Sequence, residues 1–281
     1  MRMGAPVRFA VIGDMHLGYD DDSLRNSEAA LTDAVSLEPD LAVFCGDLVN
    51  LNDGYWHLFD HVAGILGGIP FMVARGNADY AAGGDDPWLR EVPGPIREVR
   101  DLGPVRFLAV GCVSGAHEME LGPGAEDWIV ANANARPDAL VVVVSHAPVK
   151  DTTFWSCDNT ESGCMAEALG PQSPPYHLYL ARSEEMRAAL RRCPSVRMFL
   201  TGHVHNDHRL SCSHGYGPIV EQDGVIHAVT ANLGGWVGFG VPRREYRLVS
   251  ISEGGILVQV RDFLSHDWVC GLERRFPLRA G

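Results

Sequence analysis

The sequence is poor in lysine and has neither a long apolar run nor a CxxC pair. Lys150 is the only lysine, and 36 acidic residues face 23 basic ones, which gives a formal charge of -13. A surface this acidic argues against a broad nucleic-acid interface, because such a face needs a stripe of basic side chains. A small anionic substrate stays possible, because a bound divalent cation can reverse the local field.

The missing apolar run and the scattered cysteines also limit where the protein is expected to work. No segment approaches the roughly 20 apolar residues that a membrane-spanning helix needs. The seven cysteines are an odd number without close pairing, which fits a reducing compartment. A strand-like stretch already begins at Val7, so no signal peptide fits before it. We therefore expect a cytoplasmic protein with no membrane contact.

The first part of the chain alternates strand and helix patterns. Short apolar, β-branched runs begin at Val7, Leu41 and Pro70 and predict buried strands. Between them, residues 27–37 and 56–66 have apolar side chains at helical spacing. The resulting β-α-β-α-β order is typical of a layered α/β fold.

The remainder of the chain continues this pattern less regularly. Residues 81–104 are rich in Gly, Pro and Asp and are predicted as loop. A helix capped by Ser183 is expected over 183–192. Further strands are expected to begin at Val105, Leu140, Val196, Tyr246 and Ile256. The last two suggest an antiparallel finish to a second sheet.

Residues with metal-binding chemistry stand at the ends of the predicted strands. They are Asp14, His16, Asp47, Asn77, His146, His203 and His205. Sites in layered α/β folds form beyond the carboxyl ends of the strands, so these side chains can converge. In an extended chain, the i, i+2 pairs Asp14/His16 and His203/His205 would each point to one side.

Mixed carboxylate and imidazole ligands indicate the kind of cation. They suit Mn, Fe, Zn or Co, whereas an all-oxygen site would favour Mg or Ca. One shared carboxylate can bridge two ions, and two ions about 3.5–4 Å apart can activate water and clamp a phosphoryl oxygen. Each motif alone is weak, because GD and GN dipeptides usually mark turns. The ordered set is the stronger signal.

That ordered set resembles the calcineurin-like metallophosphoesterases. It reads GDMH at 13–16, GD at 46–47, GNAD at 76–79, SH at 145–146 and GHVH at 202–205. The resemblance implies a single domain over 1–281 with a four-layer αββα sandwich, two central mixed sheets flanked by helices. It also implies two transition-metal ions (Mn, Fe or Zn) and a bridging hydroxide that attacks phosphorus.

The resemblance assigns a role to each ligand. Asp14, His16, Asp47 and His205 would hold the first metal. Asp47 would bridge both metals, and Asn77, His146 and His203 would complete the second site.

The chain departs from the family at one position. The family motif GNH[DE] has a histidine that contacts the phosphate and helps to protonate the leaving group, and Ala78 stands there. Loss of a general acid typically costs 10²–10⁴-fold in rate, most where the leaving group is poor. Asp79, His208 and the substrate itself are the candidates to replace it. The expected catalytic residues are thus Asp47, Asn77, Asp79 and His208.

The leading hypothesis is a hydrolase acting on a small-molecule phosphate ester, with a phosphodiester or pyrophosphate favoured over a monoester because of Ala78. The alternatives are a phosphomonoesterase for a nucleotide or specialised metabolite, a non-hydrolytic metal- or phosphate-binding protein, and a repurposed metal enzyme. An irregular insertion over about 151–180 follows His146. Loops of this length are often functional, and Trp155, Tyr176 and Tyr179 could line the substrate side.

Overall fold

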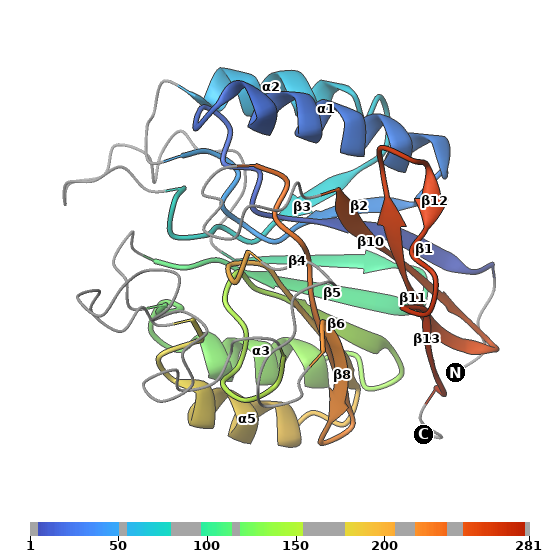
Figure 1. The fold of residues 1–281 in the computed structure, drawn as a ribbon. Coiled ribbons are helices and arrows are strands. Elements are labelled where there is room, and N and C mark those ends of the chain that lie inside the picture. Colours follow the sequence, from blue (N-terminus) through green and yellow to red (C-terminus); the bar gives the residue numbers. More distant parts are fainter. Residues whose placement is uncertain are drawn as a thin grey trace.

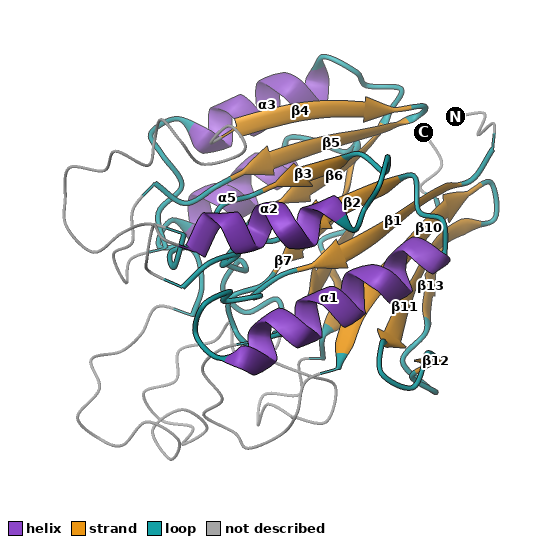
Figure 2. Ribbon diagram, turned by 90° about the horizontal axis from the view of Figure 1, so that it is seen from above, coloured by secondary structure: helices purple, strands orange, loops and turns teal. Residues whose placement is uncertain are grey.

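Two β-sheets lie face to face, and helices cover the outer side of each (Figure 1). The computed structural model describes residues 5–50, 55–79, 97–113, 119–153, 178–205, 217–234 and 244–278. Helices α1 and α2 lie on the first sheet, and helices α3 and α5 lie on the second (Figures 1 and 2). The four-layer αββα sandwich implied by the family resemblance is confirmed.

The first sheet contains the strands that start the chain and those that end it. Its order is β12-β11-β10-β1-β2-β3, and β13 pairs with β11. The strands are β1 (Val7–Ile12), β2 (Leu41–Phe44), β3 (Phe71–Val73), β10 (Glu245–Ser252), β11 (Gly255–Asp262), β12 (Asp267–Trp268) and β13 (Arg274–Phe276). β1, β2 and β3 run parallel, whereas β10 is antiparallel to β1. The sheet is therefore mixed.

The second sheet is formed by the middle of the chain, in the order β4-β5-β6-β7-β9-β8. The strands are β4 (Arg97–Leu102), β5 (Val105–Val110), β6 (Leu140–Val144), β7 (Val196–Thr201), β8 (Ile219–Gln222) and β9 (Val225–Val229). β5, β6, β7 and β9 run parallel, with antiparallel β4 and β8 at the edges. This sheet is mixed as well.

The helices each bury one face against a sheet. They are α1 (Asp21–Ser36), α2 (Trp56–Gly64), α3 (Ala125–Asn134) and α5 (Ser183–Arg191). A capping box begins α1: Asp20 accepts the N–H of Ser23 at 2.7 Å, and the Ser23 hydroxyl faces the N–H of Asp20 at 3.4 Å. None of the helices in the described ranges combines the length and hydrophobicity of a transmembrane span.

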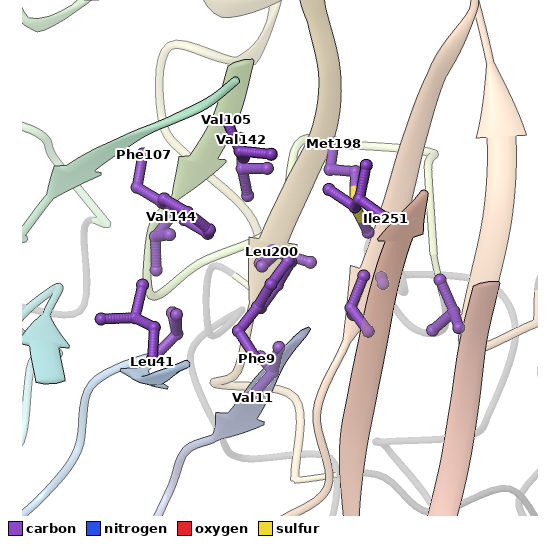
Figure 3. Packing of buried hydrophobic residues seen from close by; sticks show 14 of the residues in the cluster. Phe9, Val11, Leu41, Val105, Phe107, Val142, Val144, Met198, Leu200 and Ile251 are labelled. Atoms are coloured by element: carbon purple, nitrogen blue, oxygen red, sulfur yellow. The ribbon is translucent and has the colours of Figure 1, made fainter. Parts of the chain in front are cut away.

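The main hydrophobic core lies between the two sheets (Figure 3). Strands buried on both faces read as continuous apolar runs, as LVVVV does in β6. Phe9 of β1 meets Phe107 of β5 edge to face, with 5.0 Å between ring centroids. Separate apolar clusters join each sheet to its helices. Close packing on both sides holds the strand ends in a fixed position.

Several sequence-based expectations were wrong in detail. α1 begins at Asp21, six residues before the predicted 27, because its polar first turn is held by the cap and not by apolar spacing. Part of the loop expected over 81–104 is strand β4, an edge strand whose half-exposed surface tolerates charged residues. α3 was not anticipated.

Two further corrections concern α5 and the C-terminal strands. The N-cap of α5 is Arg182, not Ser183; the Ser183 hydroxyl instead donates to Leu180 O and accepts the N–H of Lys150. The strands after residue 245 extend the first sheet and not the second, because β10 pairs with β1. Pairing partners this far apart in sequence leave no local signal.

Candidate metal centre

The strand ends that carry the sequence motifs meet at one edge of the sandwich. The segments that follow β1 and β2 stay paired beyond the ends of the strands. The N–H of Asp14 donates to Gly46 O, and the N–H of His16 donates to Asp47 O, both at 2.9 Å. The N–H of Gly202 likewise donates to His146 O at 2.8 Å. These bonds hold the motif loops in register with their neighbours.

The backbone is left-handed at five of the seven expected ligands. The φ angles are 52° at Asp14, 46° at His16, 52° at Asp47, 70° at His203 and 47° at His205. Non-glycine residues rarely adopt this region, and such strain clusters at functional sites. The expectation that the i, i+2 pairs lie in extended chain is therefore wrong. The side chains converge because each loop turns sharply.

Four of these residues form a first group. The donor atoms of Asp14, His16, Asp47 and His205 all lie within 4.8 Å of one another. Nε2 of His16 lies 2.8 Å from Nε2 of His205 and 3.5 Å from Asp47 Oδ2. His205 Nε2 lies 3.4 Å from Asp14 Oδ1.

A second group shares Asp47 with the first. It contains Asp47, His146 and His203. His146 Nε2 lies 3.3 Å from Asp47 Oδ2, 3.2 Å from His203 Nδ1 and 3.1 Å from Asn77 Oδ1. All seven residues predicted from the sequence are thus brought together, with Asp47 common to both groups. That they bind metal stays a prediction.

The chemistry of these contacts fits a cation. His146 Nδ1 lies 2.7 Å from Cys45 O, so this nitrogen carries the proton of a neutral ring. In a neutral ring Nε2 directs a lone pair toward the oxygens of Asp47 and Asn77, an arrangement that repels unless a metal ion lies between them or Nε2 is itself protonated. The facing Nε2 atoms of His16 and His205 either share one proton in a hydrogen bond or, with both lone pairs directed inward, bind a cation. The donor set therefore suits two bound metal ions.

The pKa values of His146, His16 and Asp47 are shifted because these side chains lie close together and are buried. Burial alone would lower the pKa of His146, but the nearby Asp47 carboxylate outweighs it and raises the pKa to about 9. Burial lowers the pKa of His16 to about 4, although Asp47 opposes this. Burial opposes ionisation of Asp47, yet the imidazoles, His146 first, hold its pKa well below the usual range. In the absence of metal, protons meet the demand for positive charge.

The glycines before the ligands allow close approach between motif loops. A Cβ on Gly202 would stand 2.3 Å from Asp14 Oδ2, and one on Gly46 would stand 2.7 Å from His146 Nδ1. Any side chain at these positions would displace a ligand. Gly46 and Gly202 therefore make room for ligand side chains that belong to other motifs.

Comparison with known protein families assigns the chain to a family. A family model described as calcineurin-like phosphoesterase matches residues 7–207. The chain belongs to the calcineurin-like phosphoesterase family. No curated protein sequence matches it significantly.

Solved structures of this fold include phosphatases. A dimetal phosphatase from Danio rerio is 12% identical, with a TM-score of 0.65, and the match covers 92% of this chain and 96% of that one. Purple acid phosphatase PPD1 from yellow lupin is 15% identical, with a TM-score of 0.60 over 95% of this chain and 53% of that one. The chain thus spans about half of the lupin protein. GAP50 of Plasmodium, an anchor in the inner membrane complex, is 13% identical, with a TM-score of 0.57. The match covers 99% of this chain and 90% of GAP50.

The departure from the calcineurin-like motif is well defined in the structure. Ala78 is buried, and its N–H donates to Asp47 Oδ1 at 2.7 Å. Asp79, which follows it, accepts the N–H groups of Leu48 and Val49 on one oxygen, at 2.7 and 3.1 Å, and that of Gly76 on the other, at 2.8 Å. Asp79 thus ties two motif loops together.

These contacts bear on the proposed replacements for the missing histidine. Burial and the charge of Asp47 raise the pKa of Asp79 to about 7, although its bonds with backbone N–H groups oppose this. His208, the other side chain considered as an acid, lies outside the described residues, as do Trp155 and Tyr176. The general-acid role of Asp79 and His208 stays a prediction.

One segment in contact with the site carries no motif. Residues 230–234 run beside the Asp14 loop and bond to its backbone. They lie beyond the region 7–207 that the family model matches. The closely spaced Asn and Gly of ANLGG are a turn signal, but such signals are too common to predict a contact with Asp14.

Proposed function

We propose that the protein is a dinuclear metal-dependent hydrolase of small-molecule phosphate esters. The observation that carries the proposal is the pair of ligand groups that share Asp47. Two bound ions, with Mn, Fe or Zn suited to these ligands, would supply an activated hydroxide and neutralise charge on a phosphoryl oxygen. The ions would be held by Asp14, His16, Asp47 and His205 on one side and by Asp47, Asn77, His146 and His203 on the other.

The chain's own residues fix the geometry that this chemistry requires. Cys45 O orients His146 so that Nε2 faces the centre. The N–H of His203 donates to both oxygens of Asp14, at 2.9 and 3.1 Å, which fixes the direction of that carboxylate. Pre-oriented ligands of this kind reduce the reorganisation that reaction would otherwise need.

Ala78 bears on the substrate class. A methyl group can neither donate to a phosphoryl oxygen nor protonate a departing alkoxide. Phosphodiesters and pyrophosphates with stable leaving groups are therefore favoured over alkyl monoesters. The three backbone bonds that Asp79 accepts occupy both of its oxygens. Protonation of Asp79 for use as the acid would weaken one of those bonds, because a carboxyl O–H is a poorer acceptor than a carboxylate oxygen. His208 is the other candidate.

We also propose that the insertion over about 151–180 borders the site and selects the substrate. Its base is joined near His146, where Leu180 N–H donates to Pro148 O at 2.8 Å. Lys150 Nζ lies 5.3 Å from the centre of the Tyr179 ring, a cation–π contact that also closes the base. Because the insertion begins within a few residues of His146, its side chains can reach the substrate.

Two broader features belong to the same proposal. We propose that the protein is one domain over 1–281, since β10 and β11 complete the sheet that β1 begins. A cytoplasmic location is consistent with the free thiols of the four cysteines in the described ranges, Cys45, Cys112, Cys193 and Cys270.

A second candidate function follows from the same alanine. A site that lost its acid could bind metal and phosphate without turnover, and GAP50, which shares this fold, is described as an anchor. A phosphomonoesterase or a metal enzyme redirected to another reaction are the remaining alternatives.

Turnover of an aryl phosphodiester by metal-free protein reloaded with Mn²⁺ tests the proposal. Metal-loaded wild type should release the aryl alcohol, Asp47→Asn should not, and the exposed substitution Asp22→Asn should behave as wild type. Binding of two ions without turnover of any phosphodiester, pyrophosphate or monoester would favour the non-hydrolytic alternative.

A further inference from the structure

The segment Thr230–Gly234 follows β9 and joins the two sheets at the site edge. The N–H of Thr230 donates to Thr201 O at 2.7 Å, and its hydroxyl donates to Val11 O at 3.3 Å. Thr201 ends the strand that leads to GHVH, and Val11 lies on the strand that leads to GDMH. The segment thus touches the supports of both metal-site loops.

The peptide group of Asp14 is bound directly by this segment. The N–H groups of Leu233 and Gly234 both donate to Asp14 O, at 3.0 and 3.2 Å. Just before them, Asn232 forms a parallel β-bridge with Gly13. Asp14 is one of the residues with a left-handed backbone, at φ 52°. Two hydrogen bonds to its carbonyl therefore act where the chain is strained.

Asn232 sets the direction of one of these donors. Its side-chain Oδ1 accepts the N–H of Gly234 at 2.8 Å, so that this N–H is shared between Asn232 and Asp14. Asn232 is only 1% exposed. Its Nδ2 is buried and has no hydrogen-bond partner within the described ranges. The unpaired Nδ2 is an energetic cost, so the bond that Oδ1 accepts in the turn is the hydrogen bond that this side chain contributes.

The far side of the segment is anchored to α1. Asn26 Nδ2 donates to Leu233 O at 2.8 Å. Gly234 packs so closely that a Cβ there would stand 2.2 Å from Ser23 Cβ and 2.3 Å from Met15 O. The segment is thus fixed between α1 and the Asp14 loop and cannot shift without moving one of them.

We infer that Asn232 is a positioning residue that holds Asp14 in the conformation needed for metal binding. This inference rests on the proposed function. Asn232 acts through Gly234 on the carbonyl of Asp14, and the carboxylate of the same residue lies 3.4 Å from His205 Nε2. Loss of the side-chain oxygen leaves the segment anchored but removes the acceptor that directs the Gly234 N–H. The hold on the Asp14 carbonyl then weakens, and Asp14 relaxes toward a less strained backbone that turns its carboxylate away from His205.

Calorimetric titration of metal-free protein with Mn²⁺ tests this inference. Asn232→Ala should weaken one of the two binding steps by about 10–100-fold, the range seen when a residue that orients a ligand is lost. Asn232→Ser should restore most of the affinity, because a hydroxyl can accept the same N–H. Hydrogen exchange of the metal-free protein should show faster exchange over 230–234 in Asn232→Ala.

The control removes the same kind of bond elsewhere. Ser252 Oγ accepts the N–H of Gly254 at 3.2 Å, in the turn that follows the pairing of Ile251 with Val7, at the opposite end of β1. Ser252→Ala should leave both binding steps unchanged.

Each outcome decides a different point. Asn232→Ala with a lower Tm but wild-type affinity in both steps would make Asn232 merely structural and overturn the inference alone. Wild type that binds no metal would overturn the proposed function as well. Should Asn232→Ala fail to fold, Asn232→Gln, which moves the acceptor by one methylene, replaces it, and unchanged affinity in both of its binding steps would likewise overturn the inference.

Discussion

Gly76 lies against the carboxylate of Asp47. A Cβ on Gly76 would stand 2.2 Å from Asp47 Oδ1 and 2.4 Å from Asp47 N. Since no positive φ is found at Gly76, its need for glycine comes from this contact and not from a turn. Gly202 stands in the same relation to Asp14. The GN and GH pairs of the motifs are thus requirements of packing between ligand loops.

Gly76→Ala should displace Asp47 and remove at least one metal ion per chain. Asp47 belongs to both ligand groups, so its displacement affects both. Elemental analysis of metal-reloaded protein measures this. Gly64→Ala is the matched control, because nothing lies within 4 Å of a Cβ at the helical Gly64. It should keep two ions, and retention of both by Gly76→Ala would refute the packing argument.

Ala78 should make the reaction sensitive to the leaving group. Without a nearby acid, the departing oxygen carries its charge unaided, so aryl phosphodiesters should react much faster than alkyl ones. The measurement is the rate against leaving-group pKa under conditions where chemistry limits turnover. Ala78→His should flatten this dependence and raise activity on alkyl monoesters. A shallow dependence in wild type would mean that another group, such as Asp79 or His208, already donates the proton.

Asp33 should contribute to stability without contributing to metal binding. On α1 its buried carboxylate accepts two bonds from Arg261 at 2.9 Å, one from Tyr246 at 2.7 Å and one from His266 at 2.6 Å. Asp33→Ala leaves these donors without their acceptor and should lower the free energy of unfolding by about 3–5 kcal/mol. Denaturant titration measures this, with Asp22→Ala, at the exposed pair with Arg25, as the control. A change in Mn²⁺ affinity for Asp33→Ala would contradict the separation of roles.

His227 should make folding stability fall in mild acid. Burial, together with nearby Arg187, lowers the pKa of His227 from 6.5 to about 3. Between these values the unfolded chain binds the additional proton, so this contribution to stability is lost as pH falls from about 6.5 toward 3. The slope approaches about 1.4 kcal/mol per pH unit for one group.

The test compares slopes of unfolding free energy against pH. His227→Gln should have a shallower slope than wild type between pH 6.5 and 4, and His57→Gln, at an exposed position on α2, should keep the wild-type slope. Equal slopes for wild type and His227→Gln would show that other groups govern the acid response.

The elements that could be predicted from the sequence are those whose own residues form a continuous apolar run. Strands such as Leu140–Val144 are buried on both faces, so their composition identifies them without further context. β4 has the sequence REVRDL and was not predicted as a strand, because a half-exposed edge strand does not need apolar residues. α1 was placed too late for a related reason, since its first turn is held by Asp20 and Ser23 and not by apolar packing.

The candidate site was predictable in its residues but not in its geometry. Strand-end positions indicated which side chains could meet, and the structure brings Asp14, Asp47 and His146 together. The left-handed backbone of the ligands and the contact of Asn232 with the Asp14 loop depend on neighbours distant in sequence. Local patterns contain no information about such neighbours.

The central claim is a two-metal centre that shares Asp47, and a metal count on two proteins tests it most directly. Wild type and Asp47→Asn are stripped with chelator, reloaded with Mn²⁺, desalted and measured by elemental analysis together with protein concentration. The account predicts two ions per chain for wild type and at most one for Asp47→Asn. Absence of retained metal in reloaded wild type, or two ions in both proteins, would contradict it.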